Sequence, residues 1–204
     1  MRRIQPRRSP AVPLILLSLA GAAAVLSLWW QNTPNVEGTA QWLTHAGRLS
    51  GLLGGYVLAL VVLQMARVPA LERRVGSDRV SRWHALSGRY ALCLIVAHVG
   101  LIIAGYAEQA GTGLVDQSVT VVMDYPDMIK AVVGTAMLVV IGLISAGMVR
   151  RRMPYEVWYY LHLFTYLAVF LTFWHQLATG AEFVGNKTAE TAWYALYGTV
   201  TALV

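Results

Sequence analysis

The sequence predicts an all-α integral membrane protein, a bundle of six transmembrane helices with the N- and C-termini in the cytoplasm. Of its 204 residues, 57% are hydrophobic and only 13% are charged, and the mean hydropathy is +0.54. Six long apolar runs divide the chain, and about 20 apolar residues are needed for one helix to cross a bilayer. The same composition excludes a disordered chain, and the single cysteine excludes a small scaffold held by disulfides.

The apolar runs occupy residues 12–30, 45–66, 82–106, 128–149, 155–179 and 189–204. The first continues beyond the small-residue stretch 20–24 to Trp29 and Trp30, which favours a retained helix over a cleaved signal peptide. The last run ends in TVTALV with no polar cap, so we expect a fragment of a longer protein. The predicted organisation is a basic cytoplasmic segment, 1–11, followed by a six-helix transmembrane domain, 12–204.

Basic residues alternate from one connecting segment to the next. One side carries Arg2, Arg3, Arg7, Arg8, Arg67, Arg73, Arg74, Arg79, Arg82, Arg150, Arg151 and Arg152. The other side carries Lys130 and Lys187 among the acids Glu37, Glu108, Asp116, Asp124, Asp127, Glu182 and Glu190. Because arginine-rich loops stay in the cytoplasm, this alternation explains the net charge of +6 as topology and excludes nucleic-acid binding.

Four of the five histidines form two pairs on two helices that run in the same direction. His84 and His98 are 14 positions apart on one predicted helix, and His162 and His175 are 13 apart on the other. These spacings separate the members of each pair by about 20 Å along the membrane normal. Haem iron takes two axial imidazoles, and helix bundles supply such ligands from facing helices. We therefore predict that His84 faces His162 and that His98 faces His175.

Other interpretations of these histidines are interhelical hydrogen bonds and a zinc or copper site, but metal sites gather their ligands in one small sphere. Thirteen residues leave the two histidines of the second helix roughly 140° apart on an ideal α-helix. That helix is expected to tighten towards a 3₁₀ turn, to bend, or to approach its two haems at different rotations.

Three further polar side chains fall inside the apolar runs. Arg48, about three residues into the second run, is a candidate partner for a propionate of the outer haem, and Arg89, five residues after His84, for one of the inner haem. The alternatives are snorkelling to the interface for Arg48 and pairing with a backbone carbonyl for Arg89. His45 has no counterpart at a matched spacing, so we expect an interhelical hydrogen bond there.

Two segments, WHALSGRYALCLIVAHV at 83–99 and YEVWYYLHLFTYLAVFLTFWHQLATG at 155–180, resemble the transmembrane domain of ferric reductases and NADPH oxidases. The resemblance extends over about residues 47–179. It implies six helices around two stacked b-type haems, with His84 and His162 ligating the inner haem iron and His98 and His175 the outer one. It also implies a path for electrons from NAD(P)H through FAD in a cytosolic domain to both haems, and then to ferric iron or dioxygen outside.

The chain departs from that pattern in two respects. The midpoint between His162 and His175 is Ala168 rather than an aromatic residue, which leaves Phe170 as a weak candidate for a bridging role. No glycine-rich dinucleotide motif follows a strand, so FAD and NAD(P)H belong to a missing domain or a partner protein. The alternatives are a stand-alone haem subunit that feeds a periplasmic reductase and a non-catalytic membrane protein.

Two expectations concern the surroundings of the domain. Few lysines and abundant Ala, Val and Arg favour a bacterial inner membrane. Residues 107–127 form the longest predicted extracytoplasmic loop, and its acidic side chains favour attraction of cationic ferric species, or simply solvation.

Overall fold

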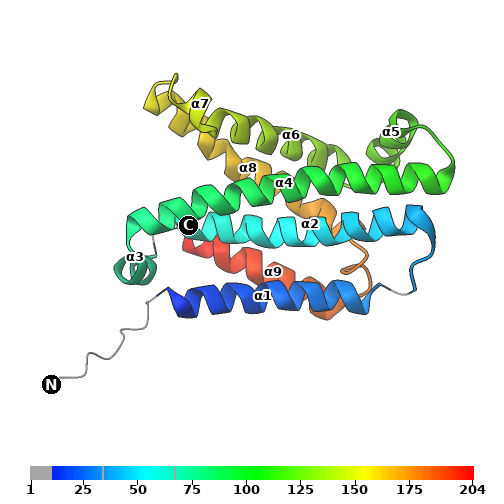
Figure 1. Cartoon of the computed structure of the whole chain (residues 1–204), viewed down its shortest axis with the longest axis horizontal. Helices are drawn as coiled ribbons and strands as arrows, with labels where there is room; N and C mark the ends of the chain where they lie inside the picture. The colour runs from blue at the N-terminus through cyan, green and yellow to red at the C-terminus, as the bar shows by residue number, and fades with distance from the viewer. Residues whose placement is uncertain (1–10, 34, 67) are drawn as a thin grey trace.

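A computed structural model describes residues 11–33, 35–66 and 68–204, which form nine helices and no strands (Figure 1). The all-helical prediction is therefore confirmed for these residues. The predicted arginines Arg2, Arg3, Arg7, Arg8 and Arg67, and all but the last residue of the predicted segment 1–11, lie outside them. The helices are α1 Val12–Gln31, α2 Gly38–Met65, α3 Pro69–Val75, α4 Ser77–Ala110, α5 Leu114–Asp124, α6 Met128–Ser145, α7 Gly147–Arg150, α8 Tyr155–Thr179 and α9 Lys187–Leu203.

Five of these helices, α1, α2, α4, α6 and α8, are long and apolar enough to cross a membrane. They correspond to the first five predicted spans, so a multi-pass membrane protein is supported. The sixth predicted span forms α9, whose 17 residues reach about 26 Å, short of the roughly 30 Å of a hydrocarbon core. Six spans and cytoplasmic termini thus stay predictions.

Turns between helices are made by residues with special backbone preferences. Gly76, at φ +89°, separates α3 from α4, and Gly111, at φ +65°, ends α4 in the left-handed conformation that glycine adopts without strain. Pro154 precedes α8, and the Asn186 side chain caps α9 by accepting a hydrogen bond from the Ala189 amide. These local signals explain where the helices start and stop.

The segment 107–127 is not the simple loop that the sequence suggested. Helix α4 continues to Ala110, and α5 then occupies Leu114–Asp124. Val121 and Gln117 of α5 are buried, while Val115, Val119 and Met123 are exposed at a spacing of four residues. The spacing of four residues within each set places the buried side chains on one face of α5 and the exposed apolar ones on another.

Two close helix pairs organise the bundle: α2 packs along α4, and α6 packs along α8. Small residues allow the approach. A Cβ atom added to Gly47 would lie 3.0 Å from the Ile102 backbone nitrogen of α4, and one added to Gly134 would lie 2.8 Å from the Ala168 carbonyl oxygen of α8. A second contact region joins α1, α2 and α9 through Val25, Tyr56, Trp193 and Tyr197.

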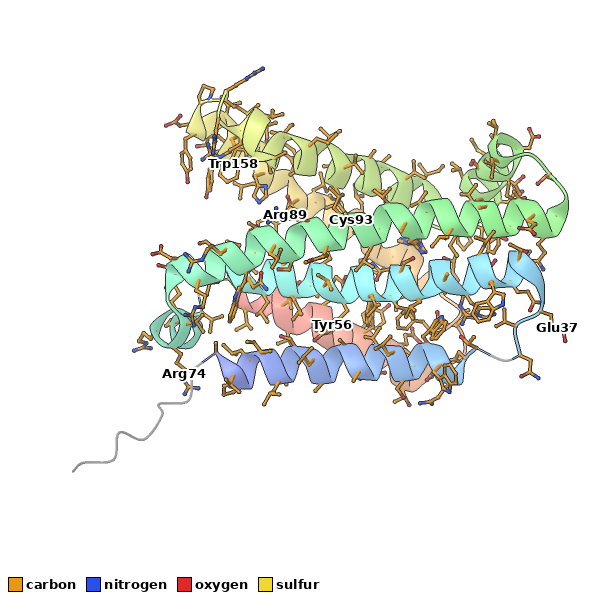
Figure 2. All side chains as sticks on the ribbon, in the orientation of Figure 1. Glu37, Tyr56, Arg74, Arg89, Cys93 and Trp158 are labelled. Atoms are coloured by element: carbon orange, nitrogen blue, oxygen red, sulfur yellow. The ribbon has the colours of Figure 1, made fainter. Side chains whose placement is uncertain are left out.

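The two ends of the bundle differ in charge. Figure 1 places α3 and α7, which carry arginines, at one end, and α5 with its acidic residues at the other. Figure 2 labels Arg74 and Trp158 at the first end and Glu37 at the opposite end. We call the end with α3 and α7 the arginine end. The segregation agrees with the alternating charges in the sequence.

Candidate functional site

The paired histidines meet across the bundle in the combinations expected from their spacing. His84 of α4 faces His162 of α8, with 5.9 Å between ring centroids and an interplanar angle of 81°. His98 faces His175 on the same two helices, with centroids 6.4 Å apart and an angle of 39°. We call the first the inner couple, because it lies towards the arginine end, and the second the outer couple.

Helix α8 brings both of its histidines to α4 without a change of helix type. It is α-helical over Tyr155–Thr179, so the first of the three alternatives, a 3₁₀ turn, is not observed in this helix. A bend, or approach at two different rotations, remains as the explanation for the 13-residue spacing between His162 and His175. In either case the two couples are separated along the helices by roughly 20 Å.

The separation within each couple suits one metal ion between the rings. Metal–imidazole bonds are about 2 Å long, and a ring nitrogen lies about 1 Å from its centroid, so two imidazoles on opposite sides of one ion have centroids about 6 Å apart. The observed 5.9 and 6.4 Å match this value. Two histidines leave the remaining ligands of an octahedral iron to the four nitrogens of a porphyrin.

Hydrogen bonds set the ring tautomer of the two histidines on α4. His84 Nδ1 lies 3.1 Å from the Val61 carbonyl oxygen, and His98 Nδ1 lies 2.8 Å from the Gly47 carbonyl oxygen. A carbonyl can only accept, so each Nδ1 carries the proton and donates. In the neutral imidazole each Nε2 then keeps its lone pair, which is the arrangement found in metal-ligating histidines.

The histidines on α8 have different neighbours. His162 Nδ1 lies 3.2 Å from the Ser145 hydroxyl, and the Trp158 indole N–H donates to the same oxygen at 3.2 Å. His175 Nδ1 is buried and has no hydrogen-bond partner among the described residues. Because buried polar atoms are rarely left unpaired, this orphaned nitrogen is consistent with an outer couple that is completed by a further group.

An apolar layer lies between the two levels. Its buried members are Leu58 of α2, Leu138 of α6 and Ala168 of α8, and Ala168 is fully shielded from solvent. Leu92, Ile95, Met137 and Val169 pack against them. Ala168 was expected at this midpoint. Phe170 is 57% exposed and is not among the residues of this layer, which gives no support to a bridging role for it.

Three or more His, Cys, Asp or Glu side chains gather nowhere in the described ranges closely enough to hold a metal ion together. The candidate donor set therefore consists of the two histidine couples. It fits an iron porphyrin, which brings four ligands of its own, better than zinc, which takes four ligands from its surroundings.

Comparison with known proteins agrees with this geometry. The model of the ferric reductase like transmembrane component family matches residues 50–173, more than half of the chain. The chain belongs to this family. The match includes His84, His98 and His162 and ends shortly before His175. Membership in the ferric reductase-like family suggests a role in transmembrane electron transfer and a membrane oxidoreductase as the kind of protein. No curated protein and no solved structure matches the chain.

Arg48 has a partner that the sequence did not indicate. Its guanidinium forms an ion pair with Glu182, to which Nε donates at 2.8 Å, and it also donates to the Asn32 carbonyl at 3.2 Å. Glu182, which the sequence analysis counted among the acids of the outer side, is only 2% exposed. Helix α2 begins at Gly38, so Arg48 lies ten residues into the helix rather than three. The anion beside Arg48 is thus a protein carboxylate, and a propionate contact stays a prediction.

His45 contributes to this cluster within its own helix. Its Nδ1 lies 3.1 Å from Arg48 Nη1, three residues further along α2, and its ring is buried. The expected interhelical bond of the His45 side chain is not observed; the interhelical contact is made by its backbone carbonyl, which accepts from the Trp29 indole at 2.9 Å. Sequence reasoning missed Glu182, for which the only signal was that a deep arginine needs an anion.

Arg89 lies on an exposed face of α4, and Figure 2 labels it on the same helix as Cys93. Its Nε donates to the Ala85 carbonyl at 3.1 Å. The ion pairs found within the described part of the chain do not include Arg89. The role of Arg89 at an inner propionate is therefore untested and stays a prediction.

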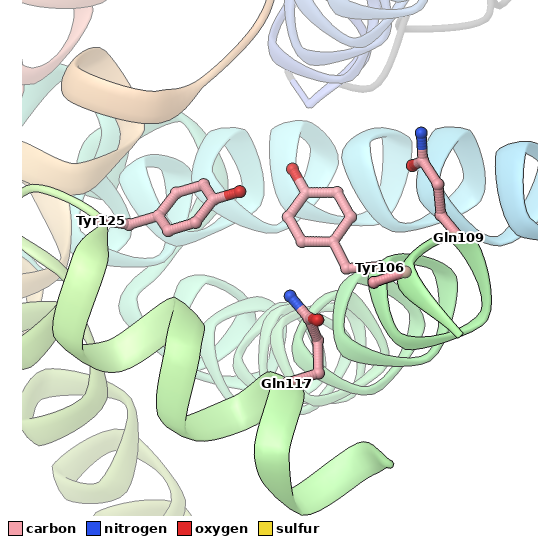
Figure 3. A pocket seen from close by; sticks show the side chains of 5 residues that line it. Tyr106, Gln109, Gln117 and Tyr125 are labelled. Carbon is pink, nitrogen blue, oxygen red and sulfur yellow. The ribbon is translucent and has the colours of Figure 1, made fainter. Parts of the chain in front are cut away.

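An open pocket of about 360 Å³ lies where α4 meets α5, at the end opposite the arginines (Figure 3). It is lined by Tyr106, Gln109, Ala110, Gln117 and Tyr125. The two tyrosine rings stack with centroids 6.1 Å apart. Because α4 also carries His98, about 12 Å along the helix from Tyr106, this pocket lies on the outer side of the outer couple.

Proposed function

We propose that the chain transfers electrons across the membrane through two b-type haems, from a cytosolic flavin and NAD(P)H donor to an extracytoplasmic acceptor, ferric iron or dioxygen. The observation that carries the proposal is the pair of histidine couples, whose ring centroids are separated by 5.9 and 6.4 Å. Their spacing, their tautomers and the family match support the same group at both levels.

In this proposal His84 and His162 hold the inner haem, and His98 and His175 hold the outer one. Bound there, each haem iron supplies a centre that accepts and releases one electron. The carbonyls of Val61 and Gly47 keep the α4 imidazoles in the tautomer that presents Nε2.

The protein between the couples keeps water out of the path. Leu58, Leu138 and Ala168 are buried, with relative exposures of 8% or less. An apolar layer of this kind lowers the local dielectric constant. A charged side chain therefore interacts strongly with a haem bound at its own level.

Charged side chains complete each level. Arg48 uses four N–H groups for Glu182, His45 and Asn32, and a guanidinium has five, so one Nη1 hydrogen is left for an outer propionate. Arg89 is free of protein carboxylates among the described residues and would serve an inner propionate. A carboxylate at membrane depth is costly unless a cation is close, which is what both arginines provide.

The orientation follows from charge. The arginine end of the bundle, which lies nearest to the inner couple, carries Arg73, Arg74 and Arg150. Arginine-rich segments remain in the cytoplasm. The donor, a flavin dehydrogenase domain or protein, then meets the inner couple. The acceptor approaches from the end of α5, where the pocket at Tyr106 and Tyr125 opens. We infer a cell membrane location, in a bacterial inner membrane.

Haem stoichiometry and reduction potentials test the proposal. The purified chain is expected to contain two b-type haems that titrate separately, and His98→Ala is expected to lose the outer one while the inner one is still reduced. Tyr160→Leu, a change at an exposed position on α8, is the control and is expected to keep both. Absence of haem, or one haem per chain in the parent, would refute the two-level arrangement. Retention of both haems in His98→Ala would refute the assignment of the outer couple.

A further inference from the structure

The inner couple carries an aromatic contact in addition to its hydrogen bond. The indole of Trp158, one turn before His162 on α8, lies 5.1 Å from the His162 ring between centroids, and the two planes are only 18° apart. The Arg150 guanidinium carbon lies 4.3 Å from the centroid of the same indole. Trp158 therefore contacts both a cation and an imidazole, and the two contacts together favour one indole orientation.

Ser145, the last residue of α6, joins the two rings. Its hydroxyl oxygen lies 3.2 Å from both Trp158 Nε1 and His162 Nδ1. An indole N–H can only donate, so the serine oxygen accepts from Trp158. When His162 Nε2 binds a metal, its Nδ1 carries the proton and donates to the same oxygen. The three side chains thus form one unit across α6 and α8.

The ring plane of His162 depends more on neighbouring side chains than the ring planes of the two α4 histidines do. The final torsion of a histidine side chain is broad, so a ligating imidazole keeps its plane only if other contacts hold it. His84 and His98 bond to backbone carbonyls, which are fixed by their helices. His162 bonds to a hydroxyl that can rotate, and the stacked indole supplies the missing constraint on the plane of the ring.

We propose that Trp158 is a positioning residue that, together with Ser145, holds the His162 ring nearly perpendicular to His84 and thereby makes the inner level electronically different from the outer one. The inference rests on the proposed function, because it concerns a ligand of the inner haem. The interplanar angle is 81° in the inner couple and 39° in the outer couple. In the outer couple, Trp174 contacts Phe170 and Phe173 instead, and no stacked partner for His175 is found among the described residues.

Electron paramagnetic resonance of the ferric protein tests this role, because the anisotropy of low-spin ferric haem depends on the angle between its two axial imidazole planes. Nearly perpendicular planes give the largest maximal g value. The parent protein is expected to show two low-spin signals, with the larger maximal g value from the inner level. The His98→Ala variant, which keeps only the inner haem, assigns the signals.

The decisive variant is Trp158→Leu, which removes the stack. With two haems per chain retained, its inner signal is expected to broaden and to shift to a smaller maximal g value, while the outer signal stays in place. Trp158→Phe keeps an aromatic face and is expected to restore the parent signal. Tyr160→Leu is the matched control: Tyr160 lies on the same helix and is 66% exposed, and its loss is expected to leave both signals unchanged.

An inner signal in Trp158→Leu identical to that of the parent would overturn the inference. If Trp158→Leu does not accumulate, Ser145→Ala replaces it, because this change removes the shared oxygen and leaves the indole in the chain. A shift of the inner signal alone then supports the inference, and an unchanged inner signal refutes it. A parent protein without bis-histidine low-spin signals would instead refute the proposed function.

Discussion

Gly51 of α2 makes room for the His98 ring, and its substitution is the sharpest steric test of the outer couple. A Cβ atom at Gly51 would lie 2.5 Å from His98 Nδ1 and 2.8 Å from Cε1. Ordinary heavy-atom contacts need about 3.5 Å, so Gly51→Ala displaces the ring by about 1 Å. The bond from Nδ1 to the Gly47 carbonyl, now 2.8 Å long, would stretch beyond the usual hydrogen-bond range.

The energetic balance can be worked from these contacts. Overpacking costs about 1–3 kcal/mol, and a lost hydrogen bond costs about 0.5–1.5 kcal/mol. Alanine offsets about 1 kcal/mol of this, because it favours a helix more than glycine does. The net cost of about 2 kcal/mol makes the haem-binding arrangement of the His98 ring less favourable. A cost of this size corresponds to roughly 30-fold weaker haem binding at the outer level.

Titration of haem into the apoprotein, followed by redox titration, measures this effect. Gly100→Ala is the matched control: it lies on α4 near His98, and no described atom is found within 4 Å of its added Cβ. The control is expected to bind two haems like the parent, whereas Gly51→Ala is expected to lose affinity at the outer level only. Parent-like affinity and potential of the outer haem in Gly51→Ala would show that the His98 ring does not occupy this position.

Three other substitutions probe the charges and the packing. Arg48→Leu leaves the Glu182 carboxylate buried without its cation, which is expected to cost about 3–5 kcal/mol of stability in thermal unfolding, and Arg48→Leu combined with Glu182→Leu should recover most of it. Failure of the double variant to recover would argue against the ion pair. In chains that still bind haem, Arg48→Leu is expected to lower the outer potential, because a nearby positive charge is lost; an unchanged potential would exclude influence on that haem. Gly134→Ala would place a Cβ atom 2.8 Å from the Ala168 carbonyl oxygen, a backbone atom that cannot swing aside, so a lower melting temperature is expected, and a parent-like value would contradict the close packing of α6 and α8.

The properties that were predictable from sequence are those that depend on position along one helix. Apolar runs of sufficient length indicated the five candidate spans, because the length of a span follows from bilayer thickness. The spacing of His84 and His98 and of His162 and His175 indicated two levels, because helix rise converts sequence separation into depth. Both couples then appear in the tertiary structure with the expected pairing.

The sequence could not indicate contacts between helices, because their geometry depends on how the helices rotate and approach one another. Membrane helices are apolar on most faces, so hydrophobic periodicity does not show which face meets which neighbour. Arg48 and Glu182 are 134 positions apart, and only the packing of the α8–α9 connection against α2 makes them partners. The same holds for Ser145, which reaches Trp158 and His162 because α6 ends beside α8, so the orientation of the inner ligand was decided by tertiary structure alone.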